Sequence, residues 1–273
     1  MQATTLALVG ATGGAGTTRT AVELAALGAR DGRDVAVIDA AFTTQGLSEY
    51  VSGRIGTDLT TLITDETGAS LSSATYPIAP GGEGIESAGI AGGGDGDDAA
   101  DLPGRADAIP ARAPFERVAR AKTAEAARKL ERRIDEAATS YDAVIVDAAP
   151  VGSNEAVAGV TAADRVAAVF PATTHGRDAL QRLRGRVADV GAGVDRSIAV
   201  ARDSAEEGTV DGGDESDAAV RLPPTDPAVA SAPTAATGTG PYARSVTAAF
   251  EDAFDTTVGI EFEEPGLVDR LRP

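Results

Sequence analysis

Continuous apolar runs alternate with helix-like stretches along most of this 273-residue chain, and this alternation strongly restricts the fold. Residues 5–9 and 35–38 are apolar runs, and the spacing of apolar residues between them predicts a helix over 18–31. Strands that are apolar at nearly every position are typical of parallel sheets buried on both faces. The pattern therefore predicts a doubly wound α/β fold with a mostly parallel sheet and helices on both faces.

The rest of the chain continues this alternation, with two interruptions. Further strands are predicted at 143–146, 165–170, 197–201 and 219–222, and helices at 123–139, 176–190 and 242–254. Residues 80–114 are rich in Gly, Asp, Ala and Pro, and residues 203–217 hold seven acids and no base. We expect both to be solvated insertions, flexible at least in part, within a single nucleotide-binding domain that spans 1–273.

The charge composition excludes several classes of function. The 24 basic residues stand against 42 acidic ones, for a net charge of −18, which opposes general affinity for nucleic acid or anionic lipid. Lys122 and Lys129 are the only lysines, a bias that resembles cytosolic proteins of salt-loving organisms. The absence of cysteine excludes thiolate chemistry, and the single histidine, His175, excludes a multi-histidine metal site and is expected in a solvated loop.

No apolar run approaches the length of a membrane span, and the N-terminal residues lack the pattern of a signal peptide. We therefore expect a cytoplasmic location and no membrane contact.

Residues 10–20 form a glycine-rich segment between the first predicted strand and the first predicted helix. Glycines at 13, 14 and 16 allow the backbone N–H groups to turn inward, and the following helix adds the positive end of its dipole. The segment therefore predicts an anion site, and the alternative is an ordinary glycine-rich turn between strand and helix.

Several motifs together resemble the MinD/ParA family of P-loop ATPases. Residues 13–18, Gly-Gly-Ala-Gly-Thr-Thr, look like its deviant Walker A loop, K-G-G-x-G-K-T-T. Residues 39–47 resemble its D-A-D-x-x-x-x-x-L switch segment, and residues 141–150, Tyr-Asp-Ala-Val-Ile-Val-Asp-Ala-Ala-Pro, its Walker B segment. Residues 162–171 and 222–229 are similar to the next strand and to the late L-P-x-D-P-x-V loop. The likeness covers nearly the whole chain in the same order.

The resemblance implies ATP and Mg²⁺ as cofactors. The nucleotide-binding residues that it implies are Gly13, Gly14, Ala15, Gly16, Thr17, Thr18, Arg19, Pro223 and Pro224. Thr18 matches the magnesium-ligating hydroxyl, and Asp39 and Asp147 match outer-shell carboxylates, all hard oxygen donors that suit Mg²⁺. The alternatives are that the two aspartates only cap strand ends, and that Arg19 is a solvated first-turn arginine.

The departures from the family pattern concern charge. Thr17 and Thr12 stand where the family has its phosphate-binding and dimer-crossing lysines, and Ala41 replaces the second switch aspartate. Losing one preorganised donor to a transition state costs on the order of 10²–10³ in rate, so little hydrolysis is expected and no catalytic residue is assigned. Arg202 and Asp203 follow the strand where the family often reads the purine with Asn.

Two functional hypotheses follow from the resemblance. The first is a nucleotide-dependent switch that positions a cellular structure, as in chromosome partitioning or division-site placement, and forms a nucleotide-dependent homodimer or a heterodimer with a paralogue. The second is a pseudo-ATPase that serves as an interaction scaffold or as a regulatory partner of an active paralogue. Neither hypothesis identifies a protein partner.

Residues 112–133 hold eight basic residues, a local contrast on an acidic chain. They are interpreted as an exposed helix face balanced by nearby acids, and contact with DNA, an acidic protein or a neighbouring protomer is the alternative. Residues 251–264 carry six acids and no base, unlike the basic membrane-binding helix that often ends MinD proteins.

Overall fold

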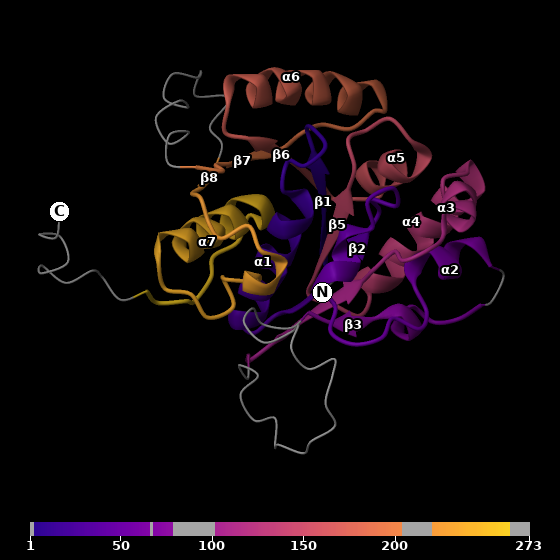
Figure 1. Ribbon diagram of the computed structural model, residues 1–273, viewed down its shortest axis with the longest axis horizontal. Helices are drawn as coiled ribbons and strands as arrows, with labels where there is room; N and C mark the ends of the chain where they lie inside the picture. The colour runs from indigo at the N-terminus through magenta and orange to yellow at the C-terminus, as the bar shows by residue number, and fades with distance from the viewer. Residues whose placement is uncertain (1–2, 66–67, 79–101, 204–219, 263–273) are drawn as a thin grey trace, which may run out of the picture.

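The computed structural model describes residues 3–65, 68–78, 102–203 and 220–262 (Figure 1). Its strands are β1 (Thr4–Gly10), β2 (Asp34–Asp39), β3 (Tyr76–Pro77), β4 (Arg105–Ile109), β5 (Ala143–Ala148), β6 (Arg165–Pro171), β7 (Arg196–Val200) and β8 (Val220–Leu222). They form one eight-stranded sheet in the order β3-β4-β2-β5-β1-β6-β7-β8. Every neighbouring pair is parallel except β3 with β4, so the sheet is mostly parallel as predicted.

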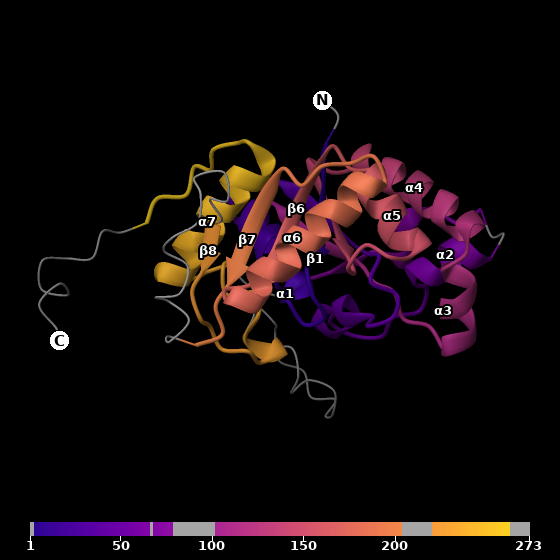
Figure 2. The same cartoon turned by 90° about the horizontal axis from the view of Figure 1, so that it is seen from above.

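Helices cover both faces of this sheet. They are α1 (Thr17–Arg30), α2 (Leu59–Thr64), α3 (Phe115–Ala121), α4 (Ala124–Ala138), α5 (Asn154–Thr161), α6 (Thr174–Asp189) and α7 (Pro241–Phe254), with short 3₁₀ turns η1 (Gly46–Tyr50), η2 (Leu71–Ala74) and η6 (Val229–Ser231). Figures 1 and 2 show α1 and α7 on one side of the sheet and α4, α5 and α6 on the other. This arrangement confirms the predicted doubly wound α/β fold.

Alternate side chains of each strand enter different cores. On β1, Leu6 and Leu8 pack in the core beneath α1 and α7, whereas Ala7 and Val9 pack in the core beneath α6. All four side chains are completely buried. The two-residue period of a strand thus explains why the apolar runs are continuous, because both faces of the sheet are covered.

The prediction of a flexible insertion over 80–114 is wrong for its last part. Residues 105–109 form β4, which lies between β3 and β2, and four of its five residues are buried. The strand was missed because it has a single large apolar residue and contains Asp107, whose carboxylate is accommodated by a hydrogen bond from the Tyr141 hydroxyl at 2.8 Å. Residues 80–101 and 204–217 of the two predicted insertions lie outside the described residues.

Helix boundaries differ from the prediction by a few residues. The helix expected at 176–190 begins at Thr174, because the Thr173 hydroxyl caps it by accepting a hydrogen bond from the N–H of Gly176. The short helices α2, α3 and α5 were not predicted, since they span only one or two turns.

Among the described residues, no helix has both the length and the apolar character that crossing a membrane requires.

The parallel strands bring their carboxyl ends to one edge of the sheet. There the glycine-rich segment follows β1, Asp39 ends β2, and Asp147 lies near the end of β5. Since β5 pairs with both β1 and β2, Asp39 and Asp147 are direct partners in the register of the two strands. This edge is where open α/β sheets bind ligands.

The packing of α7 generates a stability prediction. Phe250 is completely buried, its ring lies 4.6 Å from that of Phe254, and the Arg33 guanidinium lies 5.2 Å from the Phe250 ring centroid. We expect Phe250→Ala to lower the free energy of unfolding by roughly 3–5 kcal/mol, because it removes buried apolar surface and leaves a cavity. Denaturant unfolding in molar KCl measures this change.

Phe115 provides the matched control. Its side chain is 86% exposed at the start of α3, so Phe115→Ala should change the free energy of unfolding by about 0.5 kcal/mol or less. Equal losses in the two variants would contradict the burial of the Phe250 side chain of α7.

Candidate functional site

The glycine-rich segment adopts the backbone conformation that its sequence suggests. Gly14 and Gly16 have φ angles of +70° and +89°, a region that favours glycine, and Gly16 is the N-cap of α1. A Cβ at Gly10 would come within 2.7 Å of the Thr17 hydroxyl, so this turn is also closely packed. With no acidic residue in its first turn, α1 directs the positive end of its dipole at the loop, as an anion site requires.

A cavity of about 330 Å³ opens beside this loop. Its lining includes Thr12, Gly13, Gly14, Ala15, Gly16, Thr17, Thr18 and Arg19 from the loop and α1, together with Ala41, Tyr50 and Asp147. Seven of the predicted nucleotide-binding residues therefore surround one space, next to a predicted metal-site carboxylate.

A second cavity of about 390 Å³ adjoins the first across the loop. Its walls include Val200, Arg202, Pro223 and Tyr242, and both cavities share Gly14, Ala15, Gly16, Arg19 and Tyr50. Of the two predicted prolines, Pro223 lines this cavity and Pro224 does not. Tyr50 and Tyr242 were not singled out from the sequence, because isolated tyrosines carry no motif.

The three predicted metal-site residues lie together at the ends of β2 and β5. The Thr18 hydroxyl donates a hydrogen bond of 2.6 Å to Oδ2 of Asp147. Asp39 is completely buried and accepts backbone N–H bonds from Ala41 at 3.0 Å and Ala111 at 3.4 Å. The two aspartates therefore lie side by side in the interior of the protein.

Burial raises the pKa of both carboxyl groups. Desolvation raises the pKa of Asp39 most, and the negative charge of Asp147 raises it further. At Asp147, desolvation raises the pKa and the hydrogen bond from Thr18 lowers it in part. Two adjacent carboxylates in an apolar interior favour a proton or a cation between them. Two carboxylates and a hydroxyl are hard oxygen donors, so this set fits Mg²⁺. In the described ranges no group of three or more acids or histidines gathers as a metal site, and this candidate set has two carboxylates.

The Arg19 side chain is not solvated as the alternative supposed, because its guanidinium contacts several groups outside the glycine loop. Its Nε pairs with Glu23 at 2.8 Å, its Nη1 donates to the carbonyls of Asp226 and Ala228, and its Nη2 donates to the Thr234 hydroxyl. The buried Glu23 also accepts the backbone N–H groups of Thr234 and Ala235, at 3.0 and 2.7 Å. This pair therefore holds residues 226–235 against α1, beside both cavities.

The segment after β2 is attached to the chain that leads into α3 and α4. The Gln45 side chain exchanges two hydrogen bonds with the backbone of Ala113, at 3.0 and 2.6 Å, and Gln45 has a φ of +53°. Lys122 donates to the Thr43 hydroxyl at 2.8 Å and pairs with Glu155 at 3.1 Å. Sequence reasoning missed the contacts of Gln45 with Ala113 and of Lys122 with Thr43, because these partners lie 68 and 79 positions apart.

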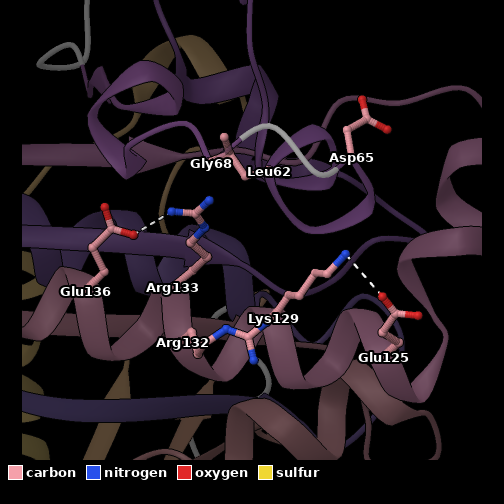
Figure 3. A pocket seen from close by; sticks show the side chains of 8 residues that line it. All are labelled: Leu62, Asp65, Gly68, Glu125, Lys129, Arg132, Arg133 and Glu136. Carbon is pink, nitrogen blue, oxygen red and sulfur yellow. Dashed lines mark hydrogen bonds and ion pairs between the residues drawn. The ribbon is translucent and has the colours of Figure 1, made fainter.

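Four of the eight basic residues of 112–133 form ion pairs with acids among the described residues, which favours the interpretation of a balanced helix face: Arg120, Lys122, Lys129 and Arg133. Figure 3 shows Lys129 with Glu125 and Arg133 with Glu136, around a cavity of about 450 Å³ between α2 and α4. This cavity shares no lining residue with the two at the glycine loop.

His175 is exposed to solvent, as predicted, but it lies in the first turn of α6 and not in a loop.

Comparison with known proteins identifies the fold. No family model matches the chain, and no curated protein sequence does. Among solved structures, a variant of Cyanothece McdA in complex with ATP is similar with a TM-score of 0.66 and 17% identity, over 95% of this chain and 99% of that one. MinD of Pyrococcus horikoshii with Mg-ADP has a TM-score of 0.60 and 16% identity, over 82% of both chains. A ParA family ATPase from Chlorobium tepidum has a TM-score of 0.59 and 18% identity, over 82% of this chain and 85% of that one.

The chain has the MinD/ParA fold. The order and spacing of the motifs had predicted this fold, although each motif matches only in part. The MinD/ParA fold explains why the glycine loop, Asp39 and Asp147 meet at one edge, since they follow or end three neighbouring parallel strands.

The raised carboxyl pKa values generate a pH prediction. Between about pH 4 and neutrality the unfolded chain releases a proton that the folded Asp39–Asp147 pair retains, so the free energy of unfolding falls as pH rises. We expect Asp39→Asn to flatten this slope by up to about 1.4 kcal/mol per pH unit, because it removes one of the two carboxyl groups that can retain a proton. Denaturant unfolding between pH 5 and 8 without divalent cations measures the slope, and an unchanged slope in the variant would show that Asp39 is already ionised in the folded protein over this range.

Proposed function

We propose that this protein is a nucleotide-dependent switch that binds a purine nucleoside triphosphate with Mg²⁺ and hydrolyses it slowly or not at all. The observation that carries the proposal is the bond between Thr18 and Asp147, with Asp39 beside them, next to a glycine loop at the start of α1. This arrangement joins an anion site to a set of hard oxygen donors.

The residues have separate roles in such a complex. Backbone N–H groups of residues 13–18 would hold the phosphates, and the cavity beside Pro223 and Tyr242 would take the base. Thr18 would hold Mg²⁺, with Asp39 and Asp147 behind it, and the ion supplies neutralisation of phosphate charge. The complexes of McdA with ATP and of MinD with Mg-ADP support this assignment by analogy.

We expect slow hydrolysis because three positions that line the cavity are uncharged where the family has charged side chains. Thr12, Thr17 and Ala41 line it without contributing charge, although they stand where the family has two lysines and an aspartate. Arg19 is committed to Glu23 and to residues 226–234, so it does not replace a phosphate-binding lysine in this arrangement. Without these groups the transition state loses stabilisation of on the order of 10²-fold or more per group.

The proposed cellular role rests on the solved structures that share this fold. One of them is described as a septum site-determining protein and another as a ParA family ATPase, which supports a role in division-site positioning or chromosome partitioning. We place the protein in the cytoplasm, as a nucleotide-dependent homodimer or a heterodimer with a paralogue. The missing charges favour a second candidate, a pseudo-ATPase that acts as a scaffold or regulates an active paralogue.

Nucleotide binding is tested by titrating the protein with a fluorescent ATP analogue in molar KCl, with and without Mg²⁺. We expect saturable, Mg²⁺-dependent binding, and Thr18→Ala or Asp147→Asn should weaken it roughly 10- to 100-fold, because each removes a group that holds or orients the ion. Thr161→Ala is the control, since its hydroxyl donates to the Val157 carbonyl within α5 and Thr161 lines neither cavity. Absence of binding at millimolar nucleotide would contradict the proposal.

The missing charges can be restored. We expect Thr17→Lys to raise affinity for triphosphate relative to diphosphate, and the double variant Thr17→Lys with Ala41→Asp to raise the hydrolysis rate on the order of 10²-fold, because a phosphate cation and a water-positioning acid return together. Thr17→Ser serves as the uncharged control. Phosphate release measures the rate, and a double variant that binds nucleotide without faster hydrolysis would favour the scaffold.

A further inference from the structure

Lys122 lies where three parts of the chain meet, at the carboxyl end of α3. Its Nζ donates a hydrogen bond of 2.8 Å to the Thr43 hydroxyl and pairs with Oε1 of Glu155 at 3.1 Å. Its backbone carbonyl accepts a hydrogen bond of 2.9 Å from the Asn154 side chain. One residue therefore connects the segment after β2, the end of α3 and the first turn of α5.

The segments that Lys122 connects also lead to walls of the cavity beside the glycine loop. Ala41, Thr44 and Gly46 line this cavity from the segment after β2. Residues 147–150 line it from the end of β5 and lead into α5. The bonds of Lys122 therefore link two parts of the cavity wall, although Lys122 does not itself line the cavity.

The buried carboxylate of Glu155 explains why the ammonium lies at this place. The Glu155 side chain is only 2% exposed, and its Oε2 has no hydrogen-bond partner among the described residues. A buried carboxylate is costly without a cation beside it, so the ion pair holds Lys122 in position. Because an ammonium has three donors, Lys122 can hold the exposed Thr43 at the same time.

A second attachment holds the same segment near the start of α3. The Gln45 side chain exchanges two hydrogen bonds with the backbone of Ala113, two residues before α3 begins. Residues 43–45 are therefore bonded to the chain at both ends of α3. A cavity wall that is ordered in advance loses less conformational entropy when a ligand binds.

We propose that Lys122 is a positioning residue for the nucleotide, whose bond to Thr43 keeps residues 41–46 in the arrangement that receives it. The inference rests on the nucleotide binding proposed above. Without this bond, residues 41–46 populate other arrangements, and the apparent affinity falls with the fraction that remains competent to bind. An exposed hydrogen bond adds only modest net stability, so the expected loss of affinity is about 3- to 10-fold.

The dissociation constant of a fluorescent ATP analogue, measured with Mg²⁺ in molar KCl, tests the inference. Lys122→Met and Thr43→Val should each weaken binding about 3- to 10-fold, whereas Lys122→Arg, which keeps the charge and the donors, should retain the affinity. The double variant of Lys122→Met with Thr43→Val should bind no more weakly than the weaker single variant, because both changes remove the same bond. Hydrogen–deuterium exchange of residues 41–46 should be faster in either single variant.

Thr43→Val keeps the ion pair of Lys122 with Glu155, so it tests the bond even if Lys122→Met unfolds. Lys129→Met is the matched control and should leave the affinity unchanged, because the chain's other lysine pairs with Glu125 and lines neither cavity at the glycine loop.

Unchanged or tighter binding by Thr43→Val would overturn the inference and leave nucleotide binding intact. Losses that add up in the double variant would also overturn it, because Lys122 would then act on the nucleotide independently of Thr43. A complete lack of binding by the unmodified protein would refute the proposed function, and this inference with it.

Discussion

The pairing of β2 with β5 places two aspartates side by side in the interior, and the candidate site depends on that register. Asp39 and Asp147 are direct neighbours across the two strands, and Thr18 reaches Asp147 from the start of α1. A shift by one residue would turn one carboxylate to the opposite face of the sheet. Burying like charges together is unfavourable, so this arrangement favours a proton or a cation between the two carboxyl groups.

Side chains of α1 hold the long connection after β8 through several hydrogen bonds. Glu23 accepts two backbone N–H groups of residues 234 and 235, and Arg19 reaches the carbonyls of Asp226 and Ala228. Arg30 donates to the carbonyls of Ala235 and Gly238 further along the same helix. One helix therefore begins at the glycine loop and also positions the wall of the neighbouring cavity.

Much of the fold could be predicted from the sequence because its signals are local. Apolar runs fully buried on both faces mark β1, β2 and β5, and positive φ at Gly14 and Gly16 matches the glycines of the loop. β4 could not be predicted, because Asp107 interrupts its apolar pattern and its partner Tyr141 lies 34 positions away. The role of Arg19 was equally hidden, since its partners beyond Glu23 are more than 200 residues distant.

The sequence by itself determined the fold class, the glycine loop at the start of α1 and the absence of charged side chains at Thr12, Thr17 and Ala41. These properties depend on residue type and on short spacings, which the chain carries locally. Only the tertiary structure decided that Arg19 supports a distant segment, that Gln45 and Lys122 attach the switch segment to residues 113–122, and that Arg202 touches Gly14. Those contacts join side chains from separate strands and helices, so they exist only once the sheet has assembled.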